Sequence, residues 1–274
     1  MTRGPDRYAV IGQPVAHSRS PWIHAQFARQ TGEHLTYSAL EIAPAELPQR
    51  LREFFAEGGQ GLNVTVPHKQ AVVPLLDELS EAARIAGAVN VISRTRAGRL
   101  RGDNTDGSGF VRDLVRNLGV TVTGLRVLLL GAGGAARGLL APLLALAPAE
   151  LAIANRSRDR ALQLARDFAG RGMLRGCGFD ELGSTPFELI INATAAGLAQ
   201  QLPPLPLAVL ESAAVCYDLV YAGGDTPFVR WAREHGVARC ADGTGMLVEQ
   251  AADSFEIWRG IRPETAAVLA AISA

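Results

Sequence analysis

The sequence predicts an α/β fold built from two domains, each with strands and helices in alternation. Short apolar or β-branched runs, such as residues 8–12 and 126–131, are followed by longer amphipathic stretches. The length of 274 residues suits two domains of ordinary size. Hydrophobic residues make up 48% and charged residues 20% of the chain, which is typical of a globular protein.

The first half of the chain contains the signals of a first α/β region. We expect strands at 8–12, 35–40, 61–66 and 88–93, a further strand near Leu100, and helices at 21–30 and 44–57. Ser20 and Pro21 suit the N-cap and the first position of a helix. Pro67 stands where another helix should begin.

A second region begins near Asp106. A helix at about 108–118 leads into the strand at 126–131, whose unbroken apolar character is typical of a buried parallel strand. Further strands are expected at 151–155, 188–192, 215–219 and 236–240, with helices at 135–146, 246–258 and from Pro263. Residues 198–206, with three prolines, read as an exposed loop.

Composition excludes several classes of function. Twenty-seven acidic residues balance 27 basic ones, so no net charge favours a nucleic acid or a membrane surface. Cys177, Cys216 and Cys240 are scattered, without metal-ligand spacing, and are typical of a reducing cytosol. The chain has no signal-peptide pattern and no apolar run of membrane-spanning length. We expect a cytoplasmic protein with no metal site.

A glycine-rich turn predicts a dinucleotide site. Residues 131–136 (GAGGAA) follow the buried strand and open a helix. In this context glycines let the backbone approach a pyrophosphate, and the helix N-terminus favours its negative charge.

The end of the next strand bears on the choice of cofactor. An NAD site expects an acidic side chain there, but residues 155–160 are NRSRDR, and Arg156 and Arg160 could hold a 2′-phosphate. The alternative is a solvated helix start in an arginine-rich protein. Three cations in a first turn oppose the helix dipole unless an anion is near, so we favour NADP.

Lys69 is the only lysine among the 27 lysine and arginine residues. It lies two residues after Pro67, in an expected first helical turn where the dipole disfavours positive charge. An arginine cannot exchange a proton usefully because its pKa lies above about 12, whereas a lysine amine can. The alternative is a chance survivor on a solvated helix, and composition alone leaves both open.

Two further segments carry polar groups at expected helix starts. Ser18 and Ser20, with free backbone N–H groups at a helix N-terminus, suit a carboxylate, although Ser20 could be an ordinary cap. Asp106 is either the N-cap of the next helix or a partner for a cation. Neither segment decides the function alone.

Eight segments in order resemble the shikimate dehydrogenase family over essentially the full length. They are 10–21 (VIGQPVAHSRSP), 61–69 (GLNVTVPHK), 87–90 (GAVN), 103–107 (DNTDG), 131–137 (GAGGAAR), 155–157 (NRS), 191–194 (INAT) and 243–250 (GTGMLVEQ). The resemblance implies reversible NADPH-dependent reduction of 3-dehydroshikimate to shikimate, in aromatic amino-acid biosynthesis.

The resemblance also assigns roles and domains. It implies a catalytic pair, Lys69 and Asp106, and substrate contacts from Ser18, Ser20, Asn63, Thr65, Asn90, Tyr221 and Gln250. It implies cofactor contacts from Gly131, Ala132, Gly133, Gly134, Ala135, Asn155, Arg156, Ser157, Arg160, Thr194, Leu219, Gly243 and Met246. Residues 1–105 with 243–274 would form the N-terminal substrate-binding domain, and 106–242 a Rossmann-type NADP-binding domain.

Two alternatives stay open from the sequence. One is a paralogue of the same fold that acts on quinate more broadly or uses NAD, which the arginines at 156–160 disfavour. The other is a non-catalytic NADP-binding regulator, which the retention of Lys69, Asp106 and both serines disfavours. Partners beyond the small-molecule substrate are not expected, and the state is a monomer or a homodimer.

Overall fold

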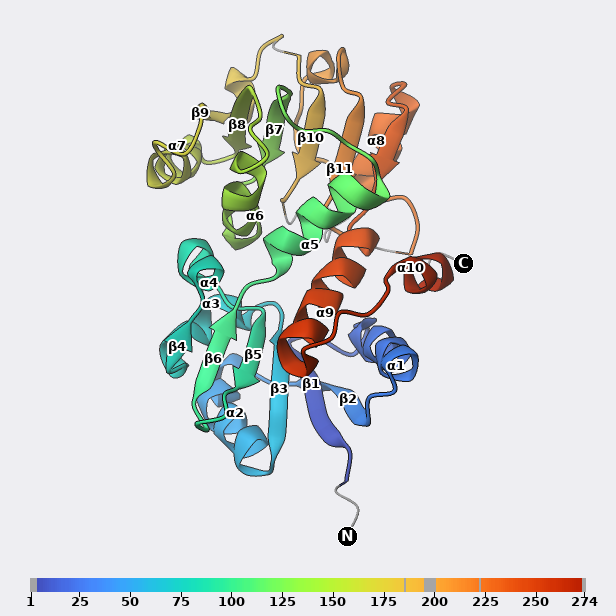
Figure 1. Cartoon of the computed structure of the whole chain (residues 1–274). Helices are drawn as coiled ribbons and strands as arrows, with labels where there is room; N and C mark the ends of the chain where they lie inside the picture. The colour runs from blue at the N-terminus through green and yellow to red at the C-terminus, as the bar shows by residue number, and fades with distance from the viewer. Residues whose placement is uncertain (1–3, 185, 195–200, 222, 273–274) are drawn as a thin grey trace. The chain divides into compact units, whose positions relative to one another are not determined.

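The computed structural model describes residues 4–184, 186–194, 201–221 and 223–272, and they form two compact units. Unit 1 runs to Gly109 and resumes at Val248–Ile272, whereas unit 2 is Phe110–Leu247. Each unit is built around its own sheet (Figure 1).

Unit 1 has a mixed six-stranded sheet with the order β2-β1-β3-β5-β6-β4. Its strands are β1 (Asp6–Gly12), β2 (Leu35–Glu41), β3 (Gly59–Val64), β4 (Glu78–Leu79), β5 (Val91–Arg94) and β6 (Leu100–Asp103). The first three are parallel, but β5 runs antiparallel to both β3 and β6. The connection between β5 and β6 is too short for a crossover, which forces an antiparallel pair.

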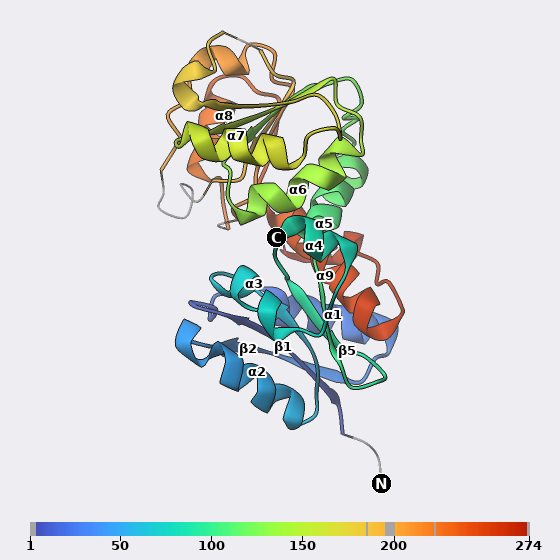
Figure 2. The same cartoon turned by 90° about the vertical axis from the view of Figure 1, so that its left-hand side faces the viewer.

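Helices cover both faces of this sheet (Figure 2). They are α1 (Ser20–Thr31), α2 (Leu47–Ala56), α3 (His68–Ala71), α4 (Glu81–Ala86), α9 (Thr244–Arg259) and α10 (Ala266–Ile272), with 3-10 turns at Pro44–Glu46 and Val73–Leu75. The α2 residues Leu51, Phe54 and Phe55 pack with Ala9 and Ile11 of β1 in one buried cluster. On the opposite face lie α1 and α9, so α9 closes this unit although it comes late in the chain.

The start of α1 differs from the prediction. The N-cap is Arg19, which already has helical backbone angles, and Ser20 lies inside the first turn. The Ser18 hydroxyl accepts the backbone N–H of Ser20 at 3.2 Å. The prediction that Ser20 caps this helix is therefore wrong by one residue. The last helix likewise begins at Ala266 rather than at Pro263.

Unit 2 has a fully parallel six-stranded sheet in the order β9-β8-β7-β10-β11-β12. Its strands are β7 (Arg126–Leu130), β8 (Glu150–Asn155), β9 (Leu174–Gly178), β10 (Leu189–Asn192), β11 (Val215–Asp218) and β12 (Arg239–Ala241). This is the 3-2-1-4-5-6 order of a Rossmann sheet, in which ligands bind at the carboxyl ends near the β7/β10 reversal. The edge strand β9 was not predicted, because its sequence LRGCG lacks the β-branched residues of a strand.

Helices also flank the second sheet. They are α5 (Asp106–Arg112), which continues as a π-helical turn (Asp113–Asn117), α6 (Gly134–Leu144), α7 (Arg158–Asp167) and α8 (Pro227–Glu234), with 3-10 turns at Phe179–Glu181 and Leu207–Leu210. Of the predicted loop 198–206, residues 198–200 lie outside the described part, and 201–206 form neither helix nor strand. No helix in the described ranges is both long and apolar enough to cross a membrane.

One guanidinium anchors the end of α9 within unit 1. Arg259 donates to Asp6 of β1 at 2.6 Å and also pairs with Glu33, which follows α1. It further donates to the Tyr8 hydroxyl at 3.3 Å. These bonds tie α9 to the two N-terminal elements, so residues of α9 such as Gln250 have a defined position over the sheet.

An uncharged histidine lies in the core beneath α1. His24 is 1% exposed and stacks on Tyr37, with ring centroids 4.2 Å apart and planes 7° from parallel. The rings of Phe27, Phe255 and Trp258 surround it. Burial lowers the pKa of His24 to about 3, so the imidazole is neutral in the folded protein at physiological pH.

This burial predicts an acid-sensitive fold. In the unfolded chain His24 takes up a proton near its ordinary pKa of about 6.5, whereas the folded protein resists it until about pH 3. The contribution of His24 to the free energy of unfolding is therefore constant above about pH 6.5. Below that pH it lowers this free energy by up to about 1.4 kcal/mol per pH unit. The His24→Phe variant should lose this slope, amounting to about 2 kcal/mol by pH 5.

The measurement is the free energy of unfolding from denaturant titrations at pH 7, 6 and 5. The control is His34→Phe, because His34 is exposed at the start of β2 and should leave the slope as it is in the wild type. Parallel wild-type and His24→Phe curves would contradict the assignment.

Candidate functional site

Lys69 and Asp106 form an ion pair in unit 1. Lys69 Nζ donates to Asp106 Oδ2 at 2.6 Å, and the two side chains are 31% and 11% exposed. Lys69 is the second residue of α3, the short helix that begins directly after Pro67. Asp106 is the first residue of α5. Because α3 has only four residues, its dipole is smaller than the sequence led us to expect. The immediate charge partner of the ammonium is the carboxylate.

The Asp106 carboxylate accepts hydrogen bonds from both Lys69 and Asn90. Its Oδ1 accepts Asn90 Nδ2 at 2.9 Å, while its backbone N–H donates to Asn104 Oδ1 at 3.1 Å. Of the two readings left open, the side chain thus has the contacts of a partner for a cation. The neighbouring Asn104 supplies the acceptor for the helix start.

The Asn90 carboxamide joins three segments of the chain. Its Nδ2 lies within hydrogen-bonding distance of Thr105 Oγ1 (3.0 Å), Asp106 Oδ1 (2.9 Å) and Gln250 Oε1 (3.2 Å), and its Oδ1 accepts the Thr105 N–H at 2.8 Å. One NH₂ group offers two protons to three acceptors. Asn90 therefore cannot give each of the three acceptors a proton of its own.

The loops after β1 and β3 lie together beside this cluster. Gln13 donates its backbone N–H to the Val66 carbonyl at 3.0 Å, and Thr65 donates to the Ile11 carbonyl at 2.9 Å. A Cβ on Gly12 would lie 2.4 Å from Thr65 Cγ2, so the two loops approach this closely only with glycine at position 12. Ser18 and Ser20 follow the first loop, and Thr65 lies in the second.

The predicted substrate residues thus fall into one unit, with one exception. Asn63, Asn90, Gln250, Lys69 and Asp106 are linked by hydrogen bonds through a shared network. Ser18, Ser20 and Thr65 occupy the adjoining loops. Tyr221 belongs to unit 2, where it follows β11.

Some residues of this network were not predicted from the sequence, among them Thr105 and Ser254. Thr105 donates to the Gln250 carbonyl at 3.1 Å, and Ser254 accepts Asn63 Nδ2 at 2.9 Å. Ser254 is fully buried and lies one helical turn after Gln250 on α9. The four-residue spacing from Gln250 was the signal that could have revealed it.

In unit 2, the glycine turn between β7 and α6 has the geometry of an anion site. Gly131 has φ = 103°, a left-handed conformation that favours glycine. Gly133 is the N-cap of α6, makes no side-chain cap bond, and a Cβ there would meet no atom within 4 Å. With Ala132, Gly134 and Ala135, this turn leaves the first N–H groups of an eleven-residue helix without a side-chain acceptor. A pyrophosphate fits these donors.

The arginines at the end of β8 divide into two kinds. Arg158 Nε donates to both carboxylate oxygens of Glu181, at 2.8 and 3.0 Å. Arg156 and Arg160 are exposed and form no ion pair with any described residue. Asn155 Nδ2 donates to the Ser157 carbonyl at 2.9 Å, which shapes the turn between them. Two unneutralised guanidiniums at this strand end suit a 2′-phosphate.

A buried carboxylate supports the ends of β10 and β11. Asp218 accepts hydrogen bonds from Asn192 Nδ2 (3.1 Å), Thr226 Oγ1 (2.7 Å) and the Val220 N–H (3.1 Å), and burial raises its pKa. Asn192 Oδ1 in turn accepts the Thr194 hydroxyl at 2.7 Å. Asn192 and Thr194 share the motif 191–194, but no supporting role was predicted for Asn192, Asp218 or Thr226, because these three residues lie on separate segments.

Buried contacts with the segment of β11 also hold the start of α9 in place. A Cβ on Gly243 would lie 2.2 Å from the Leu219 carbonyl oxygen, so this glycine permits a close backbone contact. The Met246 N–H donates to the Tyr217 hydroxyl at 3.3 Å, and that hydroxyl donates to buried Asp113 at 2.7 Å. The structure therefore brings Leu219, Gly243 and Met246 together at one end of the sheet.

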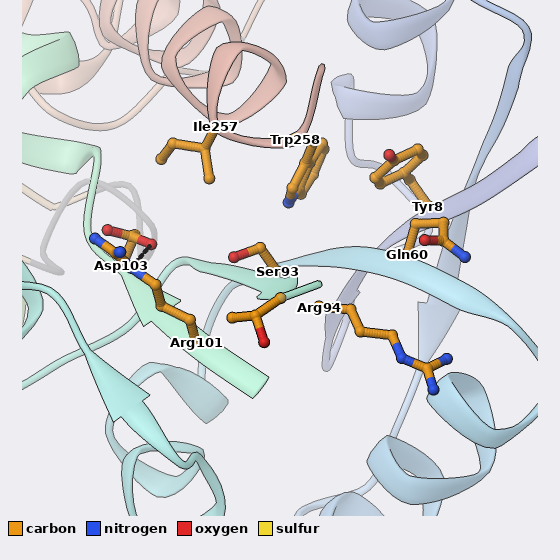
Figure 3. A pocket seen from close by; sticks show the side chains of 9 residues that line it. Tyr8, Gln60, Ser93, Arg94, Arg101, Asp103, Ile257 and Trp258 are labelled. Carbon is orange, nitrogen blue, oxygen red and sulfur yellow. Dashed lines mark ion pairs between the residues drawn. The ribbon is translucent and has the colours of Figure 1, made fainter. Parts of the chain in front are cut away.

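A separate cavity of about 410 Å³ lies on the α9 side of the unit 1 sheet (Figure 3). It is lined by Tyr8, Gln60, Ser93, Arg94, Thr95, Arg101, Asp103, Ile257 and Trp258. Arg101 and Asp103 face each other at 3.3 Å within it. None of the predicted site residues lines this cavity.

Together these features define a class of protein. A parallel sheet in Rossmann order with a glycine turn binds a dinucleotide, and an amine beside a carboxylate, amides and hydroxyls suits proton transfer to a polar ligand. This combination defines a nucleotide-dependent dehydrogenase.

Three family models match the chain. Residues 10–92 match the shikimate dehydrogenase substrate binding domain, 113–199 the shikimate/quinate 5-dehydrogenase model and 243–272 the shikimate 5′-dehydrogenase C-terminal domain. The chain is 54% identical to the shikimate dehydrogenase (NADP(+)) of Alkalilimnicola ehrlichii, over 97% of its own length and 98% of that protein. The chain belongs to the shikimate dehydrogenase family.

Solved structures agree over nearly the whole length. An Ael1 enzyme from Pseudomonas putida is similar with a TM-score of 0.92 and 46% identity, covering 98% of both chains. Shikimate 5-dehydrogenase from Thermus thermophilus, in complex with NADP(H) and shikimate, is similar with a TM-score of 0.86 and 34% identity, covering 97% of this chain and 98% of that one.

The glycine geometry predicts that alanine destabilises the protein at one position and is nearly neutral at another. Gly243→Ala should cost about 1–3 kcal/mol, because its Cβ would overlap the Leu219 carbonyl, which belongs to the backbone. At this chain length that lowers the melting temperature by about 3–10 °C. Gly133→Ala should change stability by less than about 0.5 kcal/mol, because its Cβ meets open space. Thermal unfolding of both variants checks this, and equal melting temperatures would contradict it.

Proposed function

We propose that this protein catalyses the reversible NADPH-dependent reduction of 3-dehydroshikimate to shikimate, a step toward chorismate and the aromatic amino acids. The observation that carries the proposal is the Lys69–Asp106 ion pair, held by Asn90 in a chain 54% identical to a shikimate dehydrogenase (NADP(+)). The quinate alternative is not favoured, because the curated relatives carry the shikimate name.

The substrate end of the proposal rests on unit 1. Ser18 and Ser20 would hold the carboxylate, because hydroxyls and backbone N–H groups meet at the start of α1. Thr65, Asn90 and Gln250 would bind ring hydroxyls, with Asn63 beside them. Tyr221, from unit 2, is proposed as a further substrate contact on the resemblance alone.

Proton transfer falls to Lys69. Its ammonium, held by Asp106, would give a proton to the C3 oxygen on reduction and take it back on oxidation. Asn90 keeps Asp106 oriented by binding the second carboxylate oxygen. Because amine and carboxylate lie 2.6 Å apart, Asp106 orients the ammonium through a charge-assisted hydrogen bond.

The cofactor is NADP, and unit 2 would hold it. NADPH supplies the hydride that the reaction requires. The turn at Gly131–Ala135 would bind the pyrophosphate, and Asn155, Arg156, Ser157 and Arg160 the 2′-phosphate end. Thr194, Leu219, Gly243 and Met246 would lie near the ribose and nicotinamide, positioned by the Asn192–Asp218 bond and by Tyr217.

We further propose a cytoplasmic enzyme, a monomer or a homodimer, without a nucleic-acid partner. All three cysteines are free, which suits a reducing compartment. The balanced charge offers no field for a polyanion. Residues 1–105 with 243–274 are proposed as the substrate-binding domain and 106–242 as the NADP-binding domain.

Lys69→Arg tests the proton-transfer role. The arginine keeps the positive charge beside Asp106 but cannot cycle a proton, so kcat should fall by about 100-fold or more while the KM for shikimate changes by less than about fivefold. Initial rates of NADPH formation at 340 nm measure both constants. Arg50→Lys on the exposed surface of α2 is the matched control and should behave as the wild type. A wild-type kcat in Lys69→Arg would remove this role.

The arginine pair should determine cofactor choice. A matrix of shikimate and quinate, each with NADP⁺ and NAD⁺, should give the wild type its highest kcat/KM with shikimate and NADP⁺. In the double variant Arg156→Ala, Arg160→Ala, kcat/KM for NADP⁺ should fall by about 100-fold or more, since each charged hydrogen bond contributes about 1.5–3 kcal/mol. The value for NAD⁺ should change little.

Arg158→Ala is the control for this comparison. Arg158 pairs with Glu181, so its loss should leave the ratio of NADP⁺ to NAD⁺ activity near the wild-type value. Equal losses with both cofactors in the double variant would show that the two arginines do not contact the phosphate.

A further inference from the structure

Tyr37 of β2 reaches the substrate network through its hydroxyl, although no motif in the sequence pointed to it. Its phenolic O–H donates to Asn63 Oδ1 at 2.8 Å. Burial raises the pKa of Tyr37 well above its ordinary value, and the Ser20 hydroxyl opposes this as a hydrogen-bond partner. The phenol therefore stays protonated and can serve as the donor to Asn63.

The orientation of the Asn63 carboxamide follows from its neighbours. Asn63 Nδ2 lies 3.1 Å from the Asn90 backbone carbonyl, which can only accept, so the NH₂ group must face it. The second N–H reaches Ser254 Oγ at 2.9 Å. Asn63 Oδ1 then faces Tyr37, and the phenol must be the donor of that bond.

In this orientation Asn63 keeps one position at which it can accept a further hydrogen bond. Both of its N–H groups are committed within the protein, and Tyr37 occupies one lone pair of Oδ1. Only the second lone pair remains. Asn63 can therefore accept a hydrogen bond from a ligand hydroxyl but cannot donate one.

The Tyr37 ring is itself fixed by packing. His24 stacks against it with centroids 4.2 Å apart, and both imidazole nitrogens of His24 are buried without a hydrogen-bond partner among the described residues. His24 thus packs flat against the Tyr37 ring. This stacking and the bond to Asn63 together position the hydroxyl.

We propose that Tyr37 is a positioning residue for substrate binding, which fixes Asn63 as a hydrogen-bond acceptor. The inference rests on the proposed function, because it assigns Asn63 to a ring hydroxyl of the substrate. Tyr37 itself need not touch the substrate. Its effect passes through Asn63.

Tyr37→Phe tests the inference, since it removes one oxygen and keeps the stacked ring. The KM for shikimate should rise about tenfold, as expected for one lost hydrogen bond to a binding residue, while kcat changes by less than about threefold. The KM for NADP⁺ should not change. Calorimetric titration of shikimate should show the same tenfold loss of affinity.

Tyr8→Phe is the matched control. Tyr8 is a buried tyrosine that pairs with Tyr37 across β1 and β2, but its hydroxyl contacts Arg259 and not Asn63. It should keep the wild-type KM even if its melting temperature falls. A shikimate KM within twofold of wild type in Tyr37→Phe would overturn the inference, as would equal KM increases in both variants.

A spectroscopic readout separates this inference from the proposed function. The side-chain ¹⁵N–H signals of Asn63 should shift in Tyr37→Phe and stay in place in Tyr8→Phe, with or without turnover. If the wild type neither binds nor oxidises shikimate, the proposed function fails, whereas the Asn63 signals still decide the positioning role. Unshifted signals in Tyr37→Phe would overturn it regardless of activity.

Discussion

The ion pair between Lys69 and Asp106 constrains much of unit 1. A carboxylate that is 11% exposed needs donors for both oxygens, because an unpaired buried charge costs several kcal/mol. Lys69 supplies one donor and Asn90 the other, from segments that come before and after β4 and α4 in the chain. The short antiparallel pair β5–β6 makes this possible, because it returns the chain from Asn90 to Asp106.

The N–H groups of the Asn63 and Asn90 side chains are already engaged in hydrogen bonds within unit 1. Asn63 donates to Asn90 and Ser254, and Asn90 donates to a choice of three acceptors. Polar groups arranged in this way are held rigidly, and their remaining hydrogen-bonding capacity suits a ligand rich in hydroxyl groups. A ring with several hydroxyls and one carboxylate matches that inventory, which is the chemistry of the family to which the chain belongs.

The arginines of this chain differ in whether a carboxylate lies close enough to pair with them. Arg158, Arg259 and Arg262 pair with carboxylates and serve the fold. Arg156 and Arg160 lack such partners within the described ranges and remain available for an anion. The arginines of the motif NRSRDR look alike in the sequence. Only Glu181, which lies more than twenty residues away, distinguishes Arg158 from its neighbours.

The sequence by itself determined the α/β class, most strands, the glycine turn and the family, because these depend on periodicity and on motifs read within a few residues. The uniqueness of Lys69 was also visible there. The tertiary structure decided the antiparallel β5–β6 pair, the edge strand β9, the true start of α1, and the hydrogen bonds of Thr105, Ser254 and Tyr37. Each of these depends on hydrogen bonds between segments distant in the chain, and no local pattern records which distant group will supply the partner.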